Sequence, residues 1–173
     1  MERVLVIGCG GAGKSRLARG LAGALDLPLI HLDREYWRPG WIEPTPSDWE
    51  KRVKELCAGQ QWILDGNYGG TMELRLAHAD TAILLDLPTT TCLLGVIGRR
   101  LRWLGRTRPD LPTGCPESLD LAFIRYVLAY RRTRRPVVLE RLARFDGDVV
   151  VLTSRRSARR YAAAARALQQ TVT

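Results

Sequence analysis

Short apolar runs alternate with amphipathic segments from one end of the chain to the other. The run "RVLVIG" (3–8) is rich in β-branched residues and ends at a glycine, which predicts a strand. Segment 14–25 follows it with leucines at a spacing of four, which predicts a helix. Further apolar runs predict more strands, at 27–32, 61–66, 81–88 and 148–154. Because these runs do not alternate with polar residues, we expect a parallel sheet with helices on both faces.

Helical patterns separate the later strands. Ser47 and Glu50 form a capping box that predicts a helix with an apolar stripe of Trp49, Val53, Leu56 and Cys57. Two helices are expected between the fourth and fifth strands, the first at 90–103. The second has a predicted buried face of Leu119, Ala122, Phe123, Tyr126, Val127 and Tyr130. Segment 104–118 between them is rich in Gly, Pro and Arg, which predicts a loop of the length that often forms a lid.

Length and composition fit one domain. The chain has 173 residues, of which 46% are hydrophobic and 26% charged, so we expect a single α/β domain over 1–173 with an open parallel sheet. Ligands of such sheets bind beyond the carboxyl ends of the strands. No run approaches the ~20 apolar residues of a membrane span, and no secretion signal is recognisable, so the sequence predicts a cytoplasmic protein. The four cysteines lack the spacing of a zinc site or a disulfide framework.

The turn after the first strand carries the clearest chemical signal. Residues 8–15, "GCGGAGKS", match G-x-x-x-x-G-K-S/T directly between a predicted strand and a predicted helix. The glycines let successive N–H groups face a phosphate, Lys14 is expected to reach the β- and γ-phosphates of ATP, and the Ser15 hydroxyl to bind Mg²⁺. The expected nucleotide contacts are Gly8, Gly10, Gly11, Ala12, Gly13, Lys14, Ser15 and Arg16. A turn that only connects two elements is the alternative, but the full pattern arises by chance in roughly one chain in a hundred of this size.

An acid at the end of a second apolar strand is expected to serve the metal ion. Asp65 ends "WILDG" and is followed by a glycine that allows close backbone approach, so we predict that it partners Mg²⁺. Asp86, at the end of "LLDLP", is the competing candidate, with a helix cap or a solvated strand end as its other reading.

Several segments together resemble a known group of enzymes. The phosphate loop, "LDREYWRPGW", "WILDGNY" and "GRTRPDLPTGCPE" are similar to the small P-loop kinases related to adenylate kinase, and most closely to the DNA topology modulation proteins. The resemblance implies a nucleoside-monophosphate-kinase-like sheet of five parallel strands, a short lid and ATP-dependent phosphoryl transfer. Asn67, Tyr68 and Gly69 stand where a phenylalanine, a proline and an arginine follow in adenylate kinases. The arginine for an AMP-like acceptor is therefore absent there, and Arg75 is the expected substitute.

The remaining candidates lie on the predicted acceptor side and in the lid. Asp33 is expected either to accept the proton of a substrate hydroxyl or to cap a turn. The aromatic residues near it line an acceptor pocket or belong to the core. The predicted acceptor-binding residues are Asp33, Trp37, Arg38, Tyr68 and Arg75, and the predicted lid arginines are Arg100, Arg106 and Arg108. Arg155, just past the last strand, is expected near the adenine ring, whereas His31 and His78 are assigned no chemistry.

The net charge of +9 leaves two kinds of partner open. It suits a protein that handles several phosphate groups, and the arginine clusters 131–135 and 155–160 suit nucleic acid as well. The first hypothesis is a kinase that uses ATP, Mg²⁺ and a small acceptor. The second is a nucleic-acid-associated ATPase, and the third is a nucleotide-binding regulator without turnover.

Overall fold

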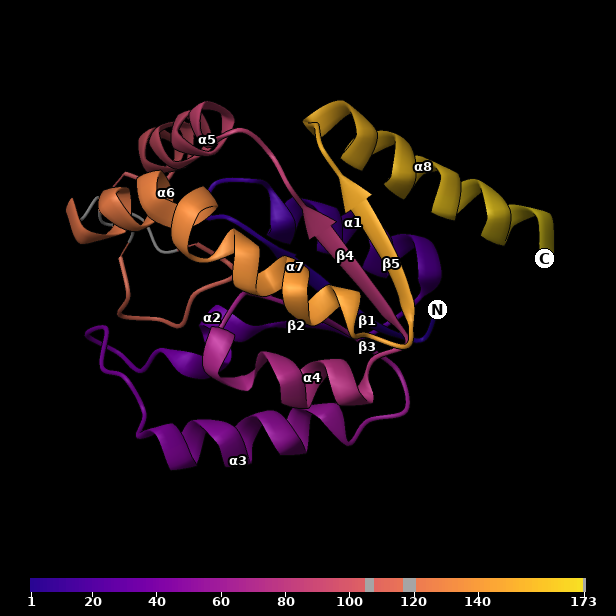
Figure 1. The fold of residues 1–173 in the computed structure, drawn as a ribbon, viewed down its shortest axis with the longest axis horizontal. Coiled ribbons are helices and arrows are strands. Elements are labelled where there is room, and N and C mark those ends of the chain that lie inside the picture. The colour runs from indigo at the N-terminus through magenta and orange to yellow at the C-terminus, as the bar shows by residue number, and fades with distance from the viewer. Residues whose placement is uncertain (105–107, 117–120, 173) are drawn as a thin grey trace.

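The computed structural model describes residues 1–104, 108–116 and 121–172. Within these ranges the chain forms a sheet of five parallel strands covered by helices on both faces (Figure 1). The strands are β1 (Arg3–Gly8), β2 (Leu29–His31), β3 (Trp62–Asp65), β4 (Thr81–Leu85) and β5 (Asp148–Leu152). Their order is β2-β3-β1-β4-β5, so that β1 lies at the centre of the sheet. The predicted fold class, an open five-stranded parallel sheet, is confirmed.

The helices divide between the two faces. They are α1 (Lys14–Leu25), α2 (Leu32–Tyr36), α3 (Pro46–Cys57), α4 (Met72–His78), α5 (Thr89–Arg102), α6 (Leu121–Thr133), α7 (Arg135–Ala143) and α8 (Arg155–Val172), with a 3₁₀ turn at Gly69–Thr71. One apolar core joins the sheet to α1, α5, α6 and α8, and the other joins it to α3, α4 and α7.

The central strand shows why its sequence is apolar throughout. Val4 and Val6 point into the first core, Leu5 and Ile7 point into the second, and all four are fully buried. Because both faces of β1 are covered, no polar position alternates with the apolar ones. At the edge of the sheet, β5 leaves Val149 and Val151 exposed.

Three predictions about the helices need correction. Helix α3 begins at Pro46, and Thr45 caps it by accepting a hydrogen bond from the Asp48 N–H at 3.1 Å, so the predicted capping box at Ser47 is wrong. Proline suits the first helical position because its missing N–H is not needed there. Among the described residues three helices, not two, separate β4 from β5, since Pro136 opens the additional helix α7. Of the predicted α6 face, Ala122 is exposed and Leu119 lies outside the described residues.

The parallel strands bring several chain segments to one edge of the sheet. Their carboxyl ends carry the segments after β1, β2 and β3 together with the start of α5, which follows β4. None of the helices in the described ranges is both long and apolar enough to cross a membrane.

Candidate active site

A cavity of about 1300 Å³ lies at this edge, and its charged residues are segregated. The lining residues from α1, α5 and α8 and from the turn before α1 include many cations and, among the described ones, no acid. These cations are Lys14, Arg16, Arg19, Arg99, Arg102, Arg155, Arg159 and Arg166, and we call this part the basic half. The other part, the acidic half, has the charged residues Asp33, Glu43, Asp65, Asp110, Arg108 and Arg134. The strand order explains part of this division, because Asp33, Glu43 and Asp65 come from β3 and the segment after β2, on one side of β1. Arg108, Asp110 and Arg134 come instead from segments between β4 and β5.

The phosphate loop is held in a conformation that glycine alone adopts without strain. Gly11 and Gly13 have φ values of 77° and 100°, in the left-handed region. A Cβ on Gly11 would also lie 2.1 Å from the carbonyl oxygen of Cys92, so α5 packs directly on the loop. The Lys14 Nζ donates to the Cys9 carbonyl at 3.1 Å, and both Lys14 and Ser15 line the cavity.

Not every predicted loop contact is available to a ligand. The Gly8 N–H donates to Asn67 Oδ1 at 2.9 Å, which ties the loop to the segment after β3. The Gly10, Gly11, Ala12, Gly13 and Arg16 positions line the cavity as predicted. Arg155 also lines it, and its guanidinium donates to the Thr91 carbonyl at 3.0 Å.

Asp65 has the surroundings that a partner of Mg²⁺ needs. It lies at the end of β3, in register with Val6 of β1 and His31 of β2, and it is only 5% exposed. Its Oδ2 is 2.8 Å from His31 Nδ1, whereas its buried Oδ1 has no hydrogen-bond partner among the described residues. A buried carboxylate oxygen without a partner is costly unless a cation or water satisfies it. Ser15 and Asp65 therefore fit a Mg²⁺ ion and its water shell.

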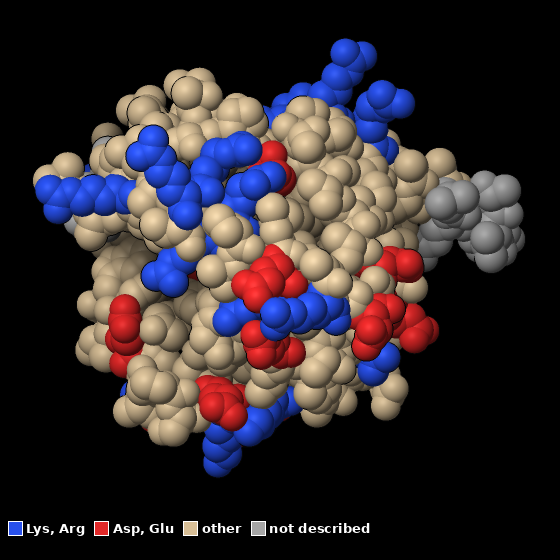
Figure 2. Space-filling view, viewed as in Figure 1, with Lys and Arg blue, Asp and Glu red and all other residues tan. Residues whose placement is uncertain are grey.

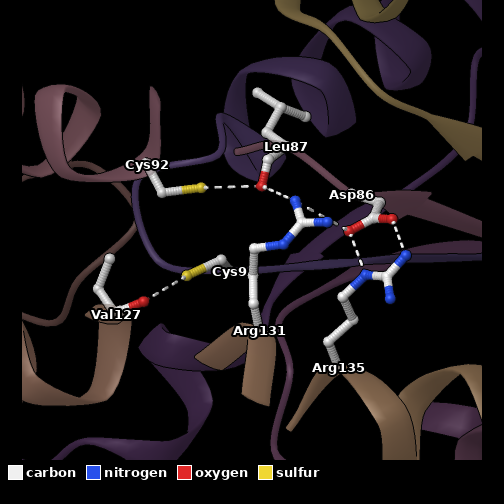
Figure 3. A network of polar contacts seen from close by, with 7 residues as sticks. All are labelled: Cys9, Asp86, Leu87, Cys92, Val127, Arg131 and Arg135. Atoms are coloured by element: carbon white, nitrogen blue, oxygen red, sulfur yellow. Dashed lines mark hydrogen bonds and ion pairs between the residues drawn. The ribbon is translucent and has the colours of Figure 1, made fainter. Parts of the chain in front are cut away.

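The competing acid, Asp86, is engaged elsewhere. Figure 3 shows its carboxylate facing Arg135 of α7, with hydrogen bonds of 2.8 and 2.6 Å to the guanidinium. Arg131 of α6 reaches toward the same place and donates to the Leu87 carbonyl at 3.3 Å. This bidentate pair fastens α7 to the end of β4, so Asp86 has a structural role.

We expect Asp86→Ala to lower the free energy of unfolding by about 2 kcal/mol, because hydrogen bonds to charged groups contribute roughly 1.5–3 kcal/mol. Hydrogen bonding to Arg135 holds the pKa of Asp86 below its ordinary value. The stabilisation is therefore complete above the unfolded-state pKa of about 3.9 and is lost as the pH falls through the lower folded-state pKa. Urea titrations at pH 7 and pH 3 measure both effects. Glu140→Ala is the control: it breaks an exposed pair with Arg144, and an equal loss there would contradict the prediction.

Asp33 is held by a hydrogen bond from the aromatic residue Tyr68. The Tyr68 hydroxyl donates to Asp33 Oδ1 at 2.8 Å. Asp33 lies in the first turn of α2, but its side chain faces the cavity and its contacts are not those of a helix cap. Desolvation raises the pKa of Asp33 above its ordinary value, although the hydrogen bond from Tyr68 acts in the opposite direction.

The described part of the predicted lid lies over this half of the cavity. Arg108 and Asp110 are 7% and 5% exposed and are 3.3 Å apart, and the Arg108 guanidinium is 3.9 Å from Asp33. Desolvation acts to raise the pKa of Asp110, but the charge of Arg108 opposes it, and the pKa lies below its ordinary value. The Gly40 N–H and the Cys115 thiol both join segment 38–40 to segment 108–116, through the Gly114 and Arg38 carbonyls. These contacts join the described part of the lid to the segment after α2.

Other predicted arginines have different places. Arg75 is fully buried, and its guanidinium donates to the backbone carbonyls of Gly66, Asn67, Tyr68 and Thr71. It positions the segment after β3 and does not reach the cavity, so its predicted role in binding the acceptor is not supported. Arg38 is exposed and is not among the described residues that line the cavity. Of the α5 arginines, Arg99 and Arg102 line the cavity, whereas Arg100 does not. Arg106 lies outside the described residues.

The structure adds residues that the sequence did not reveal. His31 was assigned no chemistry, yet strand register brings it to Asp65. Glu43, Asp110, Tyr126 and Arg134 line the cavity from segments far apart in the chain. Trp103, directly after α5, also lines the cavity. The sequence signal for this residue is the aromatic content of "YWRPGW" and "WLGR", which suggests ring stacking.

The arginine clusters are only partly a surface feature. Figure 2 shows Lys and Arg side chains gathered at the upper left of the view, over α6 and its junction with α7. In the cluster 131–135, however, Arg131 and Arg135 bond within the fold, and in the cluster 155–160 Arg155 does so as well. Fewer arginines are thus available to nucleic acid than the sequence suggested.

Sheet order and phosphate loop together define the class: the chain has the fold of the P-loop kinases. Shikimate kinase from Acinetobacter baumannii, solved in complex with shikimate, is 18% identical with a TM-score of 0.60, over 100% of this chain and 95% of that one. Shikimate kinase from Bacteroides thetaiotaomicron is 17% identical with a TM-score of 0.57, over 98% of each chain. A gluconokinase from Sinorhizobium meliloti is 14% identical with a TM-score of 0.50, over 99% and 97%.

No family model matches the chain, and no curated protein matches it in sequence. The structural likeness therefore establishes the fold. The narrower resemblance to the DNA topology modulation proteins stays a prediction.

Proposed function

We propose that the protein is a phosphotransferase that moves the γ-phosphoryl group of ATP to a hydroxyl of a small acceptor, acting as one domain over 1–173. The observation that carries the proposal is that one cavity is lined both by the phosphate loop with the cations of the basic half and by the carboxylates of the acidic half, Asp33 among them. A basic half suits a triphosphate, and Asp33 in the other half suits the acceptor hydroxyl.

Each half would contribute a separate part of the chemistry. The loop amides and Lys14 would bind the β- and γ-phosphates, while Ser15 and Asp65 would hold a Mg²⁺ ion that neutralises charge on the phosphates. Asp33 would orient the acceptor hydroxyl and accept its proton as the oxygen attacks phosphorus. Arg108 lies between Asp33 and Asp110, where a positive charge would offset charge on the transferred group. The segment 104–118 would act as the lid that excludes water, with the buried Leu111 in its described part.

Acceptor-dependent release of ADP tests the proposal. Purified protein with ATP and Mg²⁺ should release ADP when a suitable nucleoside, nucleotide or sugar is added, and a phosphorylated acceptor should appear in equal amount. ADP release that needs DNA instead, and that declines steeply with added salt, would favour the nucleic-acid-associated ATPase. If a broad acceptor panel leaves ADP release unchanged, the proposal is wrong.

Tyr68→Phe should move the acid limb of the pH profile. Asp33 must be ionised to accept a proton, and the hydrogen bond from Tyr68 lowers its pKa. Removing the hydroxyl raises that pKa further, so kcat/KM should decline at a higher pH than in the wild type. The pH dependence of kcat/KM for both proteins measures the shift. An acid limb that stays in place, or that moves to lower pH, would contradict the assignment of Asp33.

A further inference from the structure

We infer that the acceptor is a hydroxylated ring compound without an anionic group, such as a nucleoside or a neutral or amino sugar, and not its phosphorylated or carboxylated counterpart. This inference rests on the proposed phosphoryl transfer and specifies the substrate class for the acidic half of the cavity.

The charges of the acidic half disfavour an anion. Its described lining residues carry four carboxylates against two arginines. Asp33 and Glu43 come from the segment after β2 and Asp65 from the end of β3, so an entering molecule meets acids from two neighbouring strands. Carboxylates that line one cavity repel an entering anion, and the repulsion is strongest from the buried ones, Asp65 and Asp110.

The arginines of this half do not reverse that balance. Arg108 already lies beside two carboxylates, at 3.3 Å from Asp110 and 3.9 Å from Asp33. Arg75, which could have bound an acceptor phosphate, is buried and donates to backbone carbonyls. Arg134 is exposed, at the start of α7. Proteins usually bind a phosphate or carboxylate through a bidentate arginine within the site. Of these three arginines, at most Arg134 could serve in this way, and it lies at the rim.

A wall of aromatic rings provides a different kind of binding surface. Tyr36 contacts Trp37 and Tyr68 with ring centroids 4.9 and 4.6 Å apart, and Trp37 contacts Trp41 at 5.2 Å. All four rings line the cavity, and the buried Trp49 supports Tyr36 and Tyr68 from behind. Such rings bind the faces of sugars and bases, and they attract a cation more than an anion.

Backbone conformation marks the same wall as a binding surface. Trp41 and Tyr68 have φ values of 62° and 33°, and they are two of the three non-glycine residues in the described ranges with positive φ. Bulky residues rarely adopt this region, and strained residues of this kind cluster at ligand sites. Tyr36 has ring contacts with both Trp37 and Tyr68, and desolvation together with the charge of Glu43 raises its pKa. Rings and carboxylates thus form one surface, which suits a hydroxylated ring that donates hydrogen bonds to the acids.

Pairs of ring compounds that differ by an anionic group test the inference. Adenosine is compared with AMP, and glucose and glucosamine with glucuronate, by kcat/KM for ADP release and by quenching of tryptophan fluorescence without turnover. We expect the uncharged or amine-bearing member to exceed its anionic counterpart by about 100-fold or more in whichever series is accepted. A preference for AMP or glucuronate overturns the inference and leaves the kinase intact. Tight binding of the uncharged member without any ADP release overturns the kinase proposal and leaves the charge preference intact. Failure of every member to bind overturns the inference as well.

A charge variant at the wall provides a second measurement. Glu43→Gln should reduce the discrimination against the anionic member by roughly tenfold, because it removes one repulsive charge from the cavity. Glu50→Gln removes an equal charge from the exposed face of α3, where Glu50 pairs with Lys54, and should change nothing. Equal effects of the two variants would show that the preference does not arise in the acidic half.

Discussion

Lys14→Ala is expected to lower kcat/KM for ATP by about three orders of magnitude, or roughly 4 kcal/mol of transition-state stabilisation. The Lys14 ammonium lies over the loop, 3.1 Å from the Cys9 carbonyl, where it can move onto a phosphate without disturbing the backbone. In the proposed reaction its positive charge would offset the charge that develops on the β- and γ-phosphates during transfer. Calorimetry with ATP and with ADP measures the loss of nucleotide affinity, and initial rates of ADP release measure the loss of turnover.

A matched variant separates this effect from a loss of net charge. Lys54→Ala removes the same charge from the exposed face of α3 and should leave both binding and rate unchanged. Circular dichroism of both variants checks that they fold. If Lys14→Ala bound ATP as tightly as the wild type and kept its rate, then residues 8–15 would be a connecting turn and the proposed function would lose its basis.

The phosphate loop was predictable because all its parts are contiguous. The strand, the glycines, Lys14 and the helix follow one another within about twenty residues, and the backbone geometry is set locally by the left-handed glycines. The parallel sheet was predictable for a related reason, since five apolar runs without alternation imply helices on both faces.

The proposed metal site was only half predictable. Asp65 could be chosen because it ends an apolar strand before a glycine, but its pairing with His31 depends on the register of β2 against β3, which no local pattern specifies. Asp86 had an equivalent local sequence. It differs because Arg135, 49 residues further on, is brought to it by α7, a helix that the sequence did not reveal.

The acidic half could not be predicted as a unit. Its residues come from α2, segment 37–43, the end of β3, segment 108–116 and the α6–α7 junction. The local sequence around each of these positions does not distinguish a cavity-lining residue from a surface or core residue. Arg75 shows the opposite case, because the sequence predicted it in the acceptor pocket. Its guanidinium instead donates to backbone carbonyls of the turn after β3, which would otherwise be buried without hydrogen-bond partners.

Asp33→Asn is expected to reduce kcat by about 10² to 10⁴, the usual contribution of a positioned acid or base, while the affinity for ATP stays close to that of the wild type. The amide keeps the size of the carboxylate and can still accept the hydrogen bond from Tyr68, so the loss would reflect proton transfer and hydroxyl orientation. Asp48→Asn, at an exposed position in the first turn of α3, is the control.

Stability distinguishes this role from a structural one. Desolvation acts to raise the pKa of Asp33 in the folded protein, but the side chain is 44% exposed, so its ionised form is only slightly less favourable there than in the unfolded chain. Above the unfolded-state pKa of about 3.9 the carboxylate therefore destabilises the fold, and Asp33→Asn should leave the midpoint of thermal unfolding at pH 7 unchanged or raise it. The difference between the two proteins should vanish below that pH, where both side chains are neutral. If Asp33→Asn loses turnover without losing stability, the carboxylate serves the reaction and not the fold. If the variant instead unfolds at a lower temperature and keeps its rate, the role of Asp33 is structural, as the partner of Tyr68 and Arg108.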